Sequence, residues 1–356
     1  MLTRSALRAV VVPYLASRLL VLGALLATRN LLEVLEVVGR PTTLLGWDAA
    51  WYRDIAASGY GGTAAEALRF FPLFPMTARV LTLVPGIGAG PAVIVVANVA
   101  ALFALLAVYA LALEVRGDRR LARRAVWWLA FAPPSFVLVM GYSEGVFLVA
   151  TTLALLAMRR GKWWWAALAA FAAGLTRPVG VLLAVPALIE GVRTRDRRAI
   201  AVAGAPIAGT LAYLASVAGR GNGFWYPLRA QEDPARRGEW IDPVRGLVHA
   251  VREAAGGDHP TVVLHLVAAV GLVALVVVLV RRGPAALAGY AGVTLLVALS
   301  ARNYDSLERY ALAAAPFAIA LADVTGGEER ARLTAVLAGG GMVGMSVLVF
   351  AGVVVP

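Results

Sequence analysis

Long apolar runs separated by short polar segments set the hydrophobic pattern of this chain. Each run is continuous and rich in Ala, Leu and Val, and about 20 such residues cross a bilayer core about 30 Å thick as a helix. Continuous runs indicate transmembrane α-helices and not the alternating strands of a barrel. We predict about eleven spans, at residues 9–29, 91–113, 125–140, 144–158, 163–176, 178–192, 199–218, 262–280, 285–300, 309–323 and 334–355. Breaks or short helices are expected around Gly141 and Arg177.

The polar segments between the runs are of two kinds. Six short ones are basic, and they fall on one side of the membrane if the spans alternate from a cytoplasmic N-terminus. They contain Arg4 with Arg8, and residues 116–124, 159–162, 193–198, 281–282 and 330–332. Because this asymmetry follows the positive-inside rule, the net charge of +12 reflects membrane orientation and indicates no nucleic-acid partner.

Two long segments, at about 30–90 and 219–261, then lie on the opposite, non-cytoplasmic face. Apolar residues within 47–57 and again within 244–251 recur at helical spacing. Each long segment is therefore predicted to hold an amphipathic helix at the membrane surface.

The composition agrees with a multi-pass membrane protein. Hydrophobic residues make up 60% of the chain and charged residues 15%, which is unlike a soluble domain. The first run resembles a secretory signal, but many spans follow it, so we expect a retained anchor. We expect one all-α transmembrane domain over residues 1–356, located in the cell membrane.

Two acidic residues among aromatic ones follow the first span. In a helix over 47–57, Asp48 shares a face with Trp47 and Trp51, whereas Asp54 lies on another side. An acidic residue at this place is either an N-cap or solvated group, or a residue that takes part in the function at the membrane surface.

Glu144 and Arg177 lie at the outer ends of predicted spans. Glu144 either satisfies a helix dipole or meets a partner in a wet cavity. Arg177 precedes Pro178 at a break between two spans, where its guanidinium and free backbone N–H groups suit phosphate oxygens.

Two further clusters lie on the same face. Prolines in segment 70–75 are expected to prevent a regular helix and to fix a turn, as a re-entry into the bilayer or a lipid contact. Segment 303–310 gathers two acids, an arginine and two tyrosines, either as a surface salt-bridge loop or as part of a site.

Several kinds of site are disfavoured. Cysteine is absent, which excludes disulfides and thiolate metal sites. The three histidines, His249, His259 and His265, are too scattered for a metal cluster. The outer loops hold no Asp-x-Asp motif, so we expect no cofactor and no metal. Asp48 together with Asp54 leaves a divalent-cation site as an open alternative.

Six motifs occur in order over about residues 10–320. They are Ser17-Arg18-Leu19, Trp47-Asp48 with Trp51-Tyr52, Phe71-Pro72-Leu73-Phe74-Pro75, Tyr142-Ser143-Glu144 with Phe147, Thr176-Arg177 with Gly180, and Arg309-Tyr310 with Pro316. Together they resemble the PIG-V family of GPI mannosyltransferase 2 homologues in its bacterial form. The resemblance implies a GT-C-fold glycosyltransferase that moves mannose from a polyprenyl-phosphate-mannose donor to a lipid-linked glycan or other acceptor on the non-cytoplasmic face. The chain is shorter than the eukaryotic members and shows no sign of their accessory partner, which leaves the acceptor open.

The resemblance implies the catalytic role of Asp48, and the chemistry of the other residues indicates theirs. Asp48 is the expected catalytic base of an inverting transfer, and it would take the proton of the acceptor hydroxyl. Arg177 and Arg309 are expected to hold the donor phosphate, and Glu144 to orient Arg177 or a sugar hydroxyl. The residues expected to contact sugar or lipid are Trp47, Trp51, Tyr52, Phe71, Tyr142, Glu144, Asp305 and Tyr310.

Two other functions remain open at this point. In a transporter or flippase of a lipid-linked sugar, Glu144 and Arg177 would line a translocation path. In a non-catalytic membrane scaffold, the same residues would serve only the fold. Charged clusters on one face favour the enzyme, because a carrier needs some of them near the bilayer midplane.

Overall fold

The computed structural model describes residues 4–34, 42–232, 239–256, 260–301, 304 and 307–355. Helices form the regular structure of these residues, and no strand occurs within them. The α-helices are α1 (Arg4–Val34), α2 (Asp48–Ser58), α3 (Leu73–Leu81), α4 (Ala89–Arg116), α5 (Arg119–Phe131), α6 (Glu144–Arg159), α7 (Trp163–Thr176), α8 (Ala184–Thr194), α9 (Arg198–Ala218), α10 (Tyr226–Arg229), α11 (Pro243–Gly256), α12 (Pro260–Arg282), α13 (Ala285–Leu299), α14 (Leu307–Leu312), α15 (Ala315–Val324) and α16 (Glu328–Phe350). The 3₁₀ helices are η1 (Tyr60–Gly62), η2 (Ala65–Arg69), η3 (Pro133–Leu138) and η4 (Pro178–Leu183).

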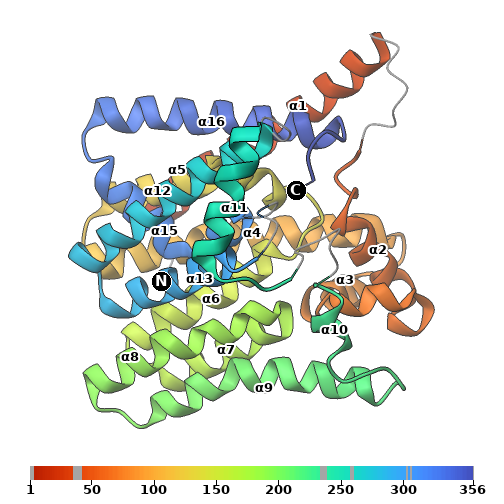
Figure 1. The fold of residues 1–356 in the computed structure, drawn as a ribbon, viewed down its shortest axis with the longest axis horizontal. Helices are drawn as coiled ribbons and strands as arrows, with labels where there is room; N and C mark the ends of the chain where they lie inside the picture. Colours follow the sequence, from red (N-terminus) through yellow and green to blue (C-terminus); the bar gives the residue numbers. More distant parts are fainter. Residues whose placement is uncertain are drawn as a thin grey trace.

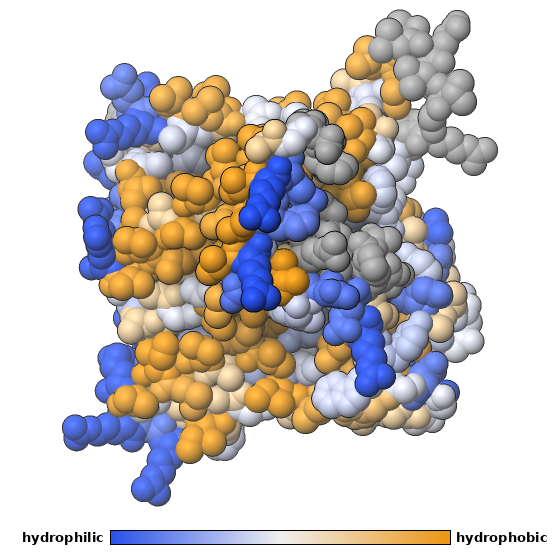
Figure 2. Space-filling model, viewed as in Figure 1, coloured by the Kyte–Doolittle hydropathy of each residue, from blue (hydrophilic) through white to orange (hydrophobic). Residues whose placement is uncertain are grey.

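Most of the long helices run side by side along one axis of the molecule (Figure 1). Within the described ranges, five are long and apolar enough to cross a membrane, namely Ala6–Glu33, Ala89–Arg116, Arg198–Ala218, Val262–Arg282 and Glu329–Phe350. Figure 2 shows hydrophobic residues over much of the left half of this face, with hydrophilic residues at its left edge, down its centre and over its right side. The prediction of an all-helical, multi-pass membrane protein is confirmed, whereas the count of about eleven spans stays a prediction.

Three of the predicted spans are broken, each at or near a proline. The span predicted at 125–140 ends as a helix at Phe131, before the Pro133-Pro134 pair, and continues as η3. The span predicted at 178–192 begins as η4 and becomes α-helical only at Ala184. The span predicted at 309–323 is divided into α14 and α15. Proline disfavours a helical conformation of the residue before it and has no backbone N–H to donate. A continuous apolar run that contains a proline therefore forms two separate helices.

Arg18 of α1 supports the broken segment at η3. Its guanidinium donates to the backbone carbonyl of Leu138 at 2.9 Å and to Oδ1 of Asn98 at 3.1 Å. The amide of Asn98, in α4, donates in turn to the carbonyl of Val139 at 3.0 Å. Because lipid offers no hydrogen bonds, these donors satisfy carbonyls that a 3₁₀ turn leaves open. Arg18 thus fixes the end of η3 that leads into α6.

The first long outer segment folds into α2, two 3₁₀ turns and α3, at the right of Figure 1. The helix predicted over 47–57 is present as α2. The expectation that prolines prevent a helix in segment 70–75 is wrong, because α3 starts at Leu73. Pro72 is its N-cap and Pro75 lies in its first turn, where a backbone N–H has no partner to lose. In the second outer segment, the predicted amphipathic helix is present as α11.

Candidate active site

An unusual turn places Asp48 at the start of α2. The preceding Trp47 has φ of 56° and ψ of −129°, a conformation that a bulky residue adopts only under constraint from its surroundings. Trp47 occupies the N-cap position and Asp48 is the first helical residue. The Asp48 carboxylate is therefore not an N-cap, and the ion pairs described next account for its position.

Two guanidinium groups hold the Asp48 carboxylate. Nη1 of Arg309 is 3.2 Å from Oδ2, and Nη2 of Arg69 is 3.6 Å from Oδ1. The side chains of Arg309 and Arg69 are only 11% and 13% exposed, whereas Asp48 keeps 29%. The guanidinium of Arg69 also lies over the ring of Phe70, 4.5 Å from its centroid. Asp48 is thus held between two cations but is still open to a ligand.

Glu144 is the second carboxylate of the site and the first residue of α6. A negative charge is favoured there by the helix dipole. Its side chain is only 2% exposed, and Oε1 lies 2.6 Å from Nη1 of Arg177 and 3.5 Å from Nε of Arg309. Glu144 therefore lies both at a helix start and beside a cation.

Arg177 reaches Glu144 because α7 ends just before it. Pro178 disfavours a helical conformation for the preceding residue, and Arg177 is extended, with φ of −154° and ψ of 146°. The chain then folds back against α7 as η4. A Cβ at Gly180 would lie 2.6 Å from the backbone of Ala173, so this close approach requires glycine.

These contacts form one continuous ion-pair chain, in the order Arg69, Asp48, Arg309, Glu144, Arg177. We refer to these five residues as the ion-pair chain. Its three guanidinium groups and two carboxylates leave a formal charge of +3 − 2 = +1. A buried cluster with surplus positive charge and forked donors suits an anion such as a phosphate group.

Tyrosine rings cover the ion-pair chain. The guanidinium carbon of Arg309 lies 5.4 Å from the centroid of the Tyr142 ring, and that of Arg177 lies 5.4 Å from the Tyr310 ring. Such contacts stabilise the cations by about 0.5–2 kcal/mol each, more where water is excluded. Tyr142 and Tyr310, both predicted to contact substrate, are thereby placed on the two arginines predicted to hold phosphate.

Tyr52 connects α2 to the turn before α6. Its hydroxyl donates a hydrogen bond of 2.8 Å to Oγ of Ser143, and its ring meets Phe70 edge-on at 4.9 Å between centroids. Burial, followed by the negative charge of Glu144, raises the pKa of Tyr52 above its ordinary value. The hydroxyl therefore stays protonated and keeps the two carboxylate-bearing helices in register.

Several buried polar atoms of the site make no hydrogen bond within the described part of the chain, among them Oε2 of Glu144 and Nε1 of Trp47. A buried acceptor and a buried donor without partners cost about 1–3 kcal/mol each unless water or a ligand meets them. Their place beside the ion-pair chain indicates a site for a polar ligand.

The structure brings together most of the residues predicted from the sequence. Asp48, Arg177, Arg309, Glu144, Tyr142, Tyr310, Trp47 and Tyr52 are in or beside the ion-pair chain. Trp51 lies next to them, stacked on Phe70 with 6.1 Å between centroids. The assigned roles of these residues stay predictions.

Two predicted or suspected residues are placed elsewhere. Phe71 is only 2% exposed and packs against Tyr213 of α9, with 4.7 Å between ring centroids, so it belongs to the core below the site. Asp54 pairs with its neighbour Arg53 on the exposed side of α2. Asp305 lies outside the residues that the structure describes.

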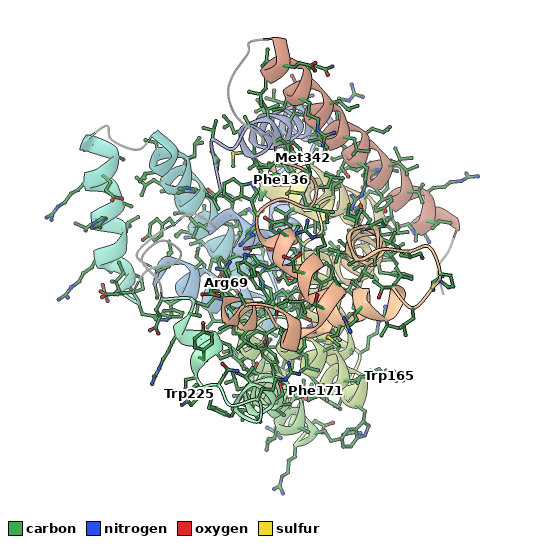
Figure 3. The ribbon with its side chains drawn as sticks, turned by 90° about the vertical axis from the view of Figure 1, so that its right-hand side faces the viewer. Arg69, Phe136, Trp165, Phe171, Trp225 and Met342 are labelled. Atoms are coloured by element: carbon green, nitrogen blue, oxygen red, sulfur yellow. The ribbon has the colours of Figure 1, made fainter. Side chains whose placement is uncertain are left out.

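Arg69 was not anticipated from the sequence. It ends η2 and directly precedes the Phe70-Phe71-Pro72 motif. Figure 3 looks onto the end of the molecule that holds α2 and α3, and Arg69 lies near the centre of that view. One signal in the sequence could have identified Arg69, namely that it directly precedes an aromatic run in a surface segment. Guanidinium groups bind favourably over aromatic rings.

Among the residues described, no group of three or more His, Asp or Glu side chains is arranged to hold a metal ion. The expected absence of a metal stays a prediction.

Comparison with known families assigns the chain. The family model described as Mannosyltransferase (PIG-V) matches residues 5–188, just over half of the 356 residues. The chain belongs to the PIG-V mannosyltransferase family. It is therefore a membrane glycosyltransferase. A search of curated proteins found no match.

The PIG-V match contains four members of the ion-pair chain, namely Asp48, Arg69, Glu144 and Arg177. The fifth, Arg309, comes from beyond the matched region, yet it joins the two carboxylates. The site of this family member is therefore completed by a helix that the family match does not cover.

Proposed function

We propose that the protein transfers mannose, with inversion, from a polyprenyl-phosphate-mannose donor to a lipid-linked glycan or another hydroxyl acceptor on the non-cytoplasmic face of the cell membrane. The observation that carries the proposal is the ion-pair chain, a buried positive cluster with a reachable carboxylate. The proposal includes a single GT-C domain with about eleven spans. The face is supported by position, because α2 and α3 lie at the end of the molecule opposite the α8–α9 turn, which is basic (Figure 1).

In the proposed step, the acceptor oxygen forms a bond to the anomeric carbon while the bond from that carbon to the phosphate oxygen breaks. The acceptor proton goes to Asp48, and the leaving polyprenyl phosphate keeps the bonding electron pair. A β-linked donor would give an α-linked product. Arg309 and Arg177 would stabilise the charge that gathers on the phosphate.

The ion pairs of Asp48 have a consequence for this step. Two guanidinium groups, at 3.2 and 3.6 Å, hold the carboxylate between them. A donor phosphate that draws Arg309 toward itself would weaken one of these pairs. The Asp48 carboxylate would then be released toward the acceptor hydroxyl only when the donor is bound, which couples donor binding to proton transfer.

Glu144 has a separate proposed role. Its Oε1 is occupied by Arg177, whereas its Oε2 is buried and makes no hydrogen bond to the described residues. A mannose hydroxyl donating to Oε2 would satisfy this oxygen. Glu144 would in this way fix both the arginine that faces the phosphate and the sugar attached to it.

The test compares wild type with Asp48→Asn and Asp54→Asn. Asp54 lies on the same helix and is exposed, so its variant is a matched control for the loss of one acidic charge. Each purified protein is incubated with polyprenyl-phosphate-mannose and a membrane lipid extract, and mannosylated product is measured. We expect Asp48→Asn to lose at least about 100-fold in rate, the scale of a lost general base, and Asp54→Asn to remain near wild type.

Each failure has a distinct meaning. Equal product from wild type and Asp48→Asn would refute the base assignment. No consumption of the donor by wild type would refute the donor class. Lipid-linked sugar that changes membrane sides without being consumed would favour the flippase instead.

A further inference from the structure

The two ends of the ion-pair chain, Arg69 and Arg177, each lie close to a backbone carbonyl that has no helical donor. Leu68 directly precedes Arg69, and Gly174 lies three residues before Arg177. The residue four positions after each of these two is a proline. In an α-helix a carbonyl accepts a hydrogen bond from the N–H four residues on, which proline does not have. Both carbonyls are therefore open to a donor from another part of the chain.

Helix α9 supplies the donor in both places. The hydroxyl of Tyr213 donates to the carbonyl of Leu68 at 2.7 Å, and the hydroxyl of Thr210 donates to the carbonyl of Gly174 at 3.3 Å. Both side chains are buried. Because Thr210 and Tyr213 are three residues apart, they share one face of the helix. A single face of α9 thus holds the backbone beside both ends of the ion-pair chain.

Further side chains hold the backbone around Arg69. The hydroxyl of Tyr60 donates to the carbonyl of Phe70 at 2.7 Å, and Nε2 of Gln231, after α10, donates to the carbonyl of Arg69 at 3.3 Å. With the bond to Leu68, three successive carbonyls accept from side chains of other segments. The backbone that carries Arg69 is therefore placed by its neighbours and not by the short η2 helix alone.

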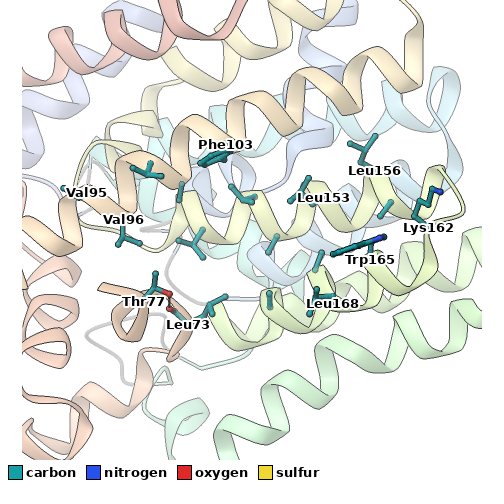
Figure 4. A pocket seen from close by; sticks show the side chains of 18 of the residues that line it. Leu73, Thr77, Val95, Val96, Phe103, Leu153, Leu156, Lys162, Trp165 and Leu168 are labelled. Atoms are coloured by element: carbon teal, nitrogen blue, oxygen red, sulfur yellow. Dashed lines mark hydrogen bonds between the residues drawn. The ribbon is translucent and has the colours of Figure 1, made fainter. Parts of the chain in front are cut away.

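At the other end of the ion-pair chain, one side of α7 is open. Leu168 and Ala172 of α7 line an apolar groove of about 900 Å³ (Figure 4), and Leu168 is 59% exposed. Helix α9 lies along α7 on another side (Figure 1). Thr210 therefore holds Gly174 from the packed side of α7, just before the helix ends at its C-cap, Arg177.

We propose that Tyr213 and Thr210 are positioning residues for the transfer reaction, and that they set the two terminal arginines of the ion-pair chain through the carbonyls of Leu68 and Gly174. The proposal rests on the proposed function for the reaction, whereas the hydrogen bonds themselves do not depend on it. Both hydroxyls come from α9, which lies beyond the region, residues 5–188, that matches the family model.

The two hydroxyls act on different parts of the site. Tyr213 acts through Arg69 on Asp48, since Arg69 lies 3.6 Å from that carboxylate. Thr210 acts through Arg177 on the proposed phosphate site. Loss of the first hydroxyl should therefore affect the chemical step, and loss of the second should affect donor binding.

The test removes one hydroxyl at a time. Tyr213→Phe and Thr210→Val nearly keep the size of each side chain, and each is the matched control for the other because both lie on one face of α9. Thr210→Ser retains the hydroxyl and should behave like wild type. Gln231→Leu is a second change at the Arg69 backbone that leaves α9 intact.

Hydrogen–deuterium exchange of the detergent-purified protein measures the backbone directly, without donor or acceptor. We expect Tyr213→Phe and Gln231→Leu to accelerate exchange about tenfold within residues 65–71 and to leave residues 172–180 as in wild type. A lost hydrogen bond makes local opening of its own segment easier. Thr210→Val should accelerate exchange only within residues 172–180, and Thr210→Ser should change neither segment.

Steady-state transfer from polyprenyl-phosphate-mannose measures the effect on the reaction. Tyr213→Phe should lower kcat about tenfold at an unchanged KM for the donor, and Thr210→Val should raise that KM about tenfold. A contacting group displaced by about 1 Å can cost up to about 100-fold. A purely structural role would reduce the amount of active enzyme and so lower kcat in both variants without changing KM.

The positioning roles are overturned in two cases. In one, each hydroxyl variant changes exchange in both segments or in neither. In the other, both variants lower kcat by the same factor at the wild-type KM. Segment-selective exchange in a protein that consumes no donor would support the positioning contacts and refute the proposed function, so the two failures are distinguishable.

Discussion

Glu144→Gln is the most informative single change in this protein. It keeps the shape of the side chain and removes its charge. The change leaves Arg177 without its 2.6 Å partner and Arg309 with only Asp48. The formal charge of the ion-pair chain rises from +1 to +2, in a place where Glu144 is 2% and Arg177 13% exposed.

The magnitude follows from this burial. Breaking a buried ion pair by removing one partner lowers the free energy of unfolding by about 3–5 kcal/mol, because the remaining charge is left uncompensated. Glu190 of α8 provides the comparison, since it is 1% exposed and pairs with Arg193 at 2.6 Å and Arg159 at 3.3 Å. Those arginines are 54% and 23% exposed, so water compensates them and Glu190→Gln should lower the same free energy by only about 1–3 kcal/mol.

The assay is the apparent melting temperature of detergent-purified protein, followed by loss of the monodisperse peak on heating. We expect the order wild type, Glu190→Gln, Glu144→Gln, from highest to lowest. Adding Arg177→Met to Glu144→Gln should restore part of the loss, because no stranded cation is left at that position. In the mannose-transfer assay, Glu144→Gln should be inactive and Glu190→Gln active.

Two results would refute this reasoning. If Glu144→Gln melts no lower than Glu190→Gln, the ion-pair chain is not a desolvated unit. If the losses of Glu144→Gln and Arg177→Met simply add, the two residues do not interact as the 2.6 Å distance requires.

Two further predictions concern the scaffold of the site. Gly174→Ala should lower the free energy of unfolding by at least about 1–3 kcal/mol, because a Cβ there would overlap the backbone of Pro206 in α9; Gly23→Ala, with open space around it, should melt like wild type or slightly higher. Arg18→Met should lower stability by about 1–3 kcal/mol and also slow transfer, because the Leu138 carbonyl loses its donor and η3 no longer positions α6; wild-type transfer rates in a folded Arg18→Met protein would contradict this.

Local sequence signals predicted part of the active site. Trp47-Asp48 and Glu144 stood out because acids next to apolar runs are expensive unless they have a partner. Arg177 stood out because Pro178 breaks its helix. Each of these signals needs only a few neighbouring residues to be read, and the structure places all three residues in one cluster with Arg309.

Other features needed the folded chain. Arg309 pairs with Asp48 across 261 positions of sequence, and no pattern near either residue specifies that contact. The contact of Arg69 with Asp48 likewise depends on how separate segments pack, and no local pattern specifies it. Phe71 was expected at the substrate, but the packing of α9 beside the segment that precedes α3 places it on Tyr213.

The sequence by itself determined that the protein is helical, crosses the membrane several times and has acidic and aromatic residues gathered in a few segments. These properties follow from the spacing of hydrophobic residues and from the positions of charges and prolines. Each of these signals spans only one or two helical turns. Only the tertiary structure decided which arginine faces which carboxylate, that Arg18 supports η3, and that an apolar groove lies between α3, α4, α6 and α7. Such contacts depend on how separate helices pack, and packing distances are not encoded in any one segment.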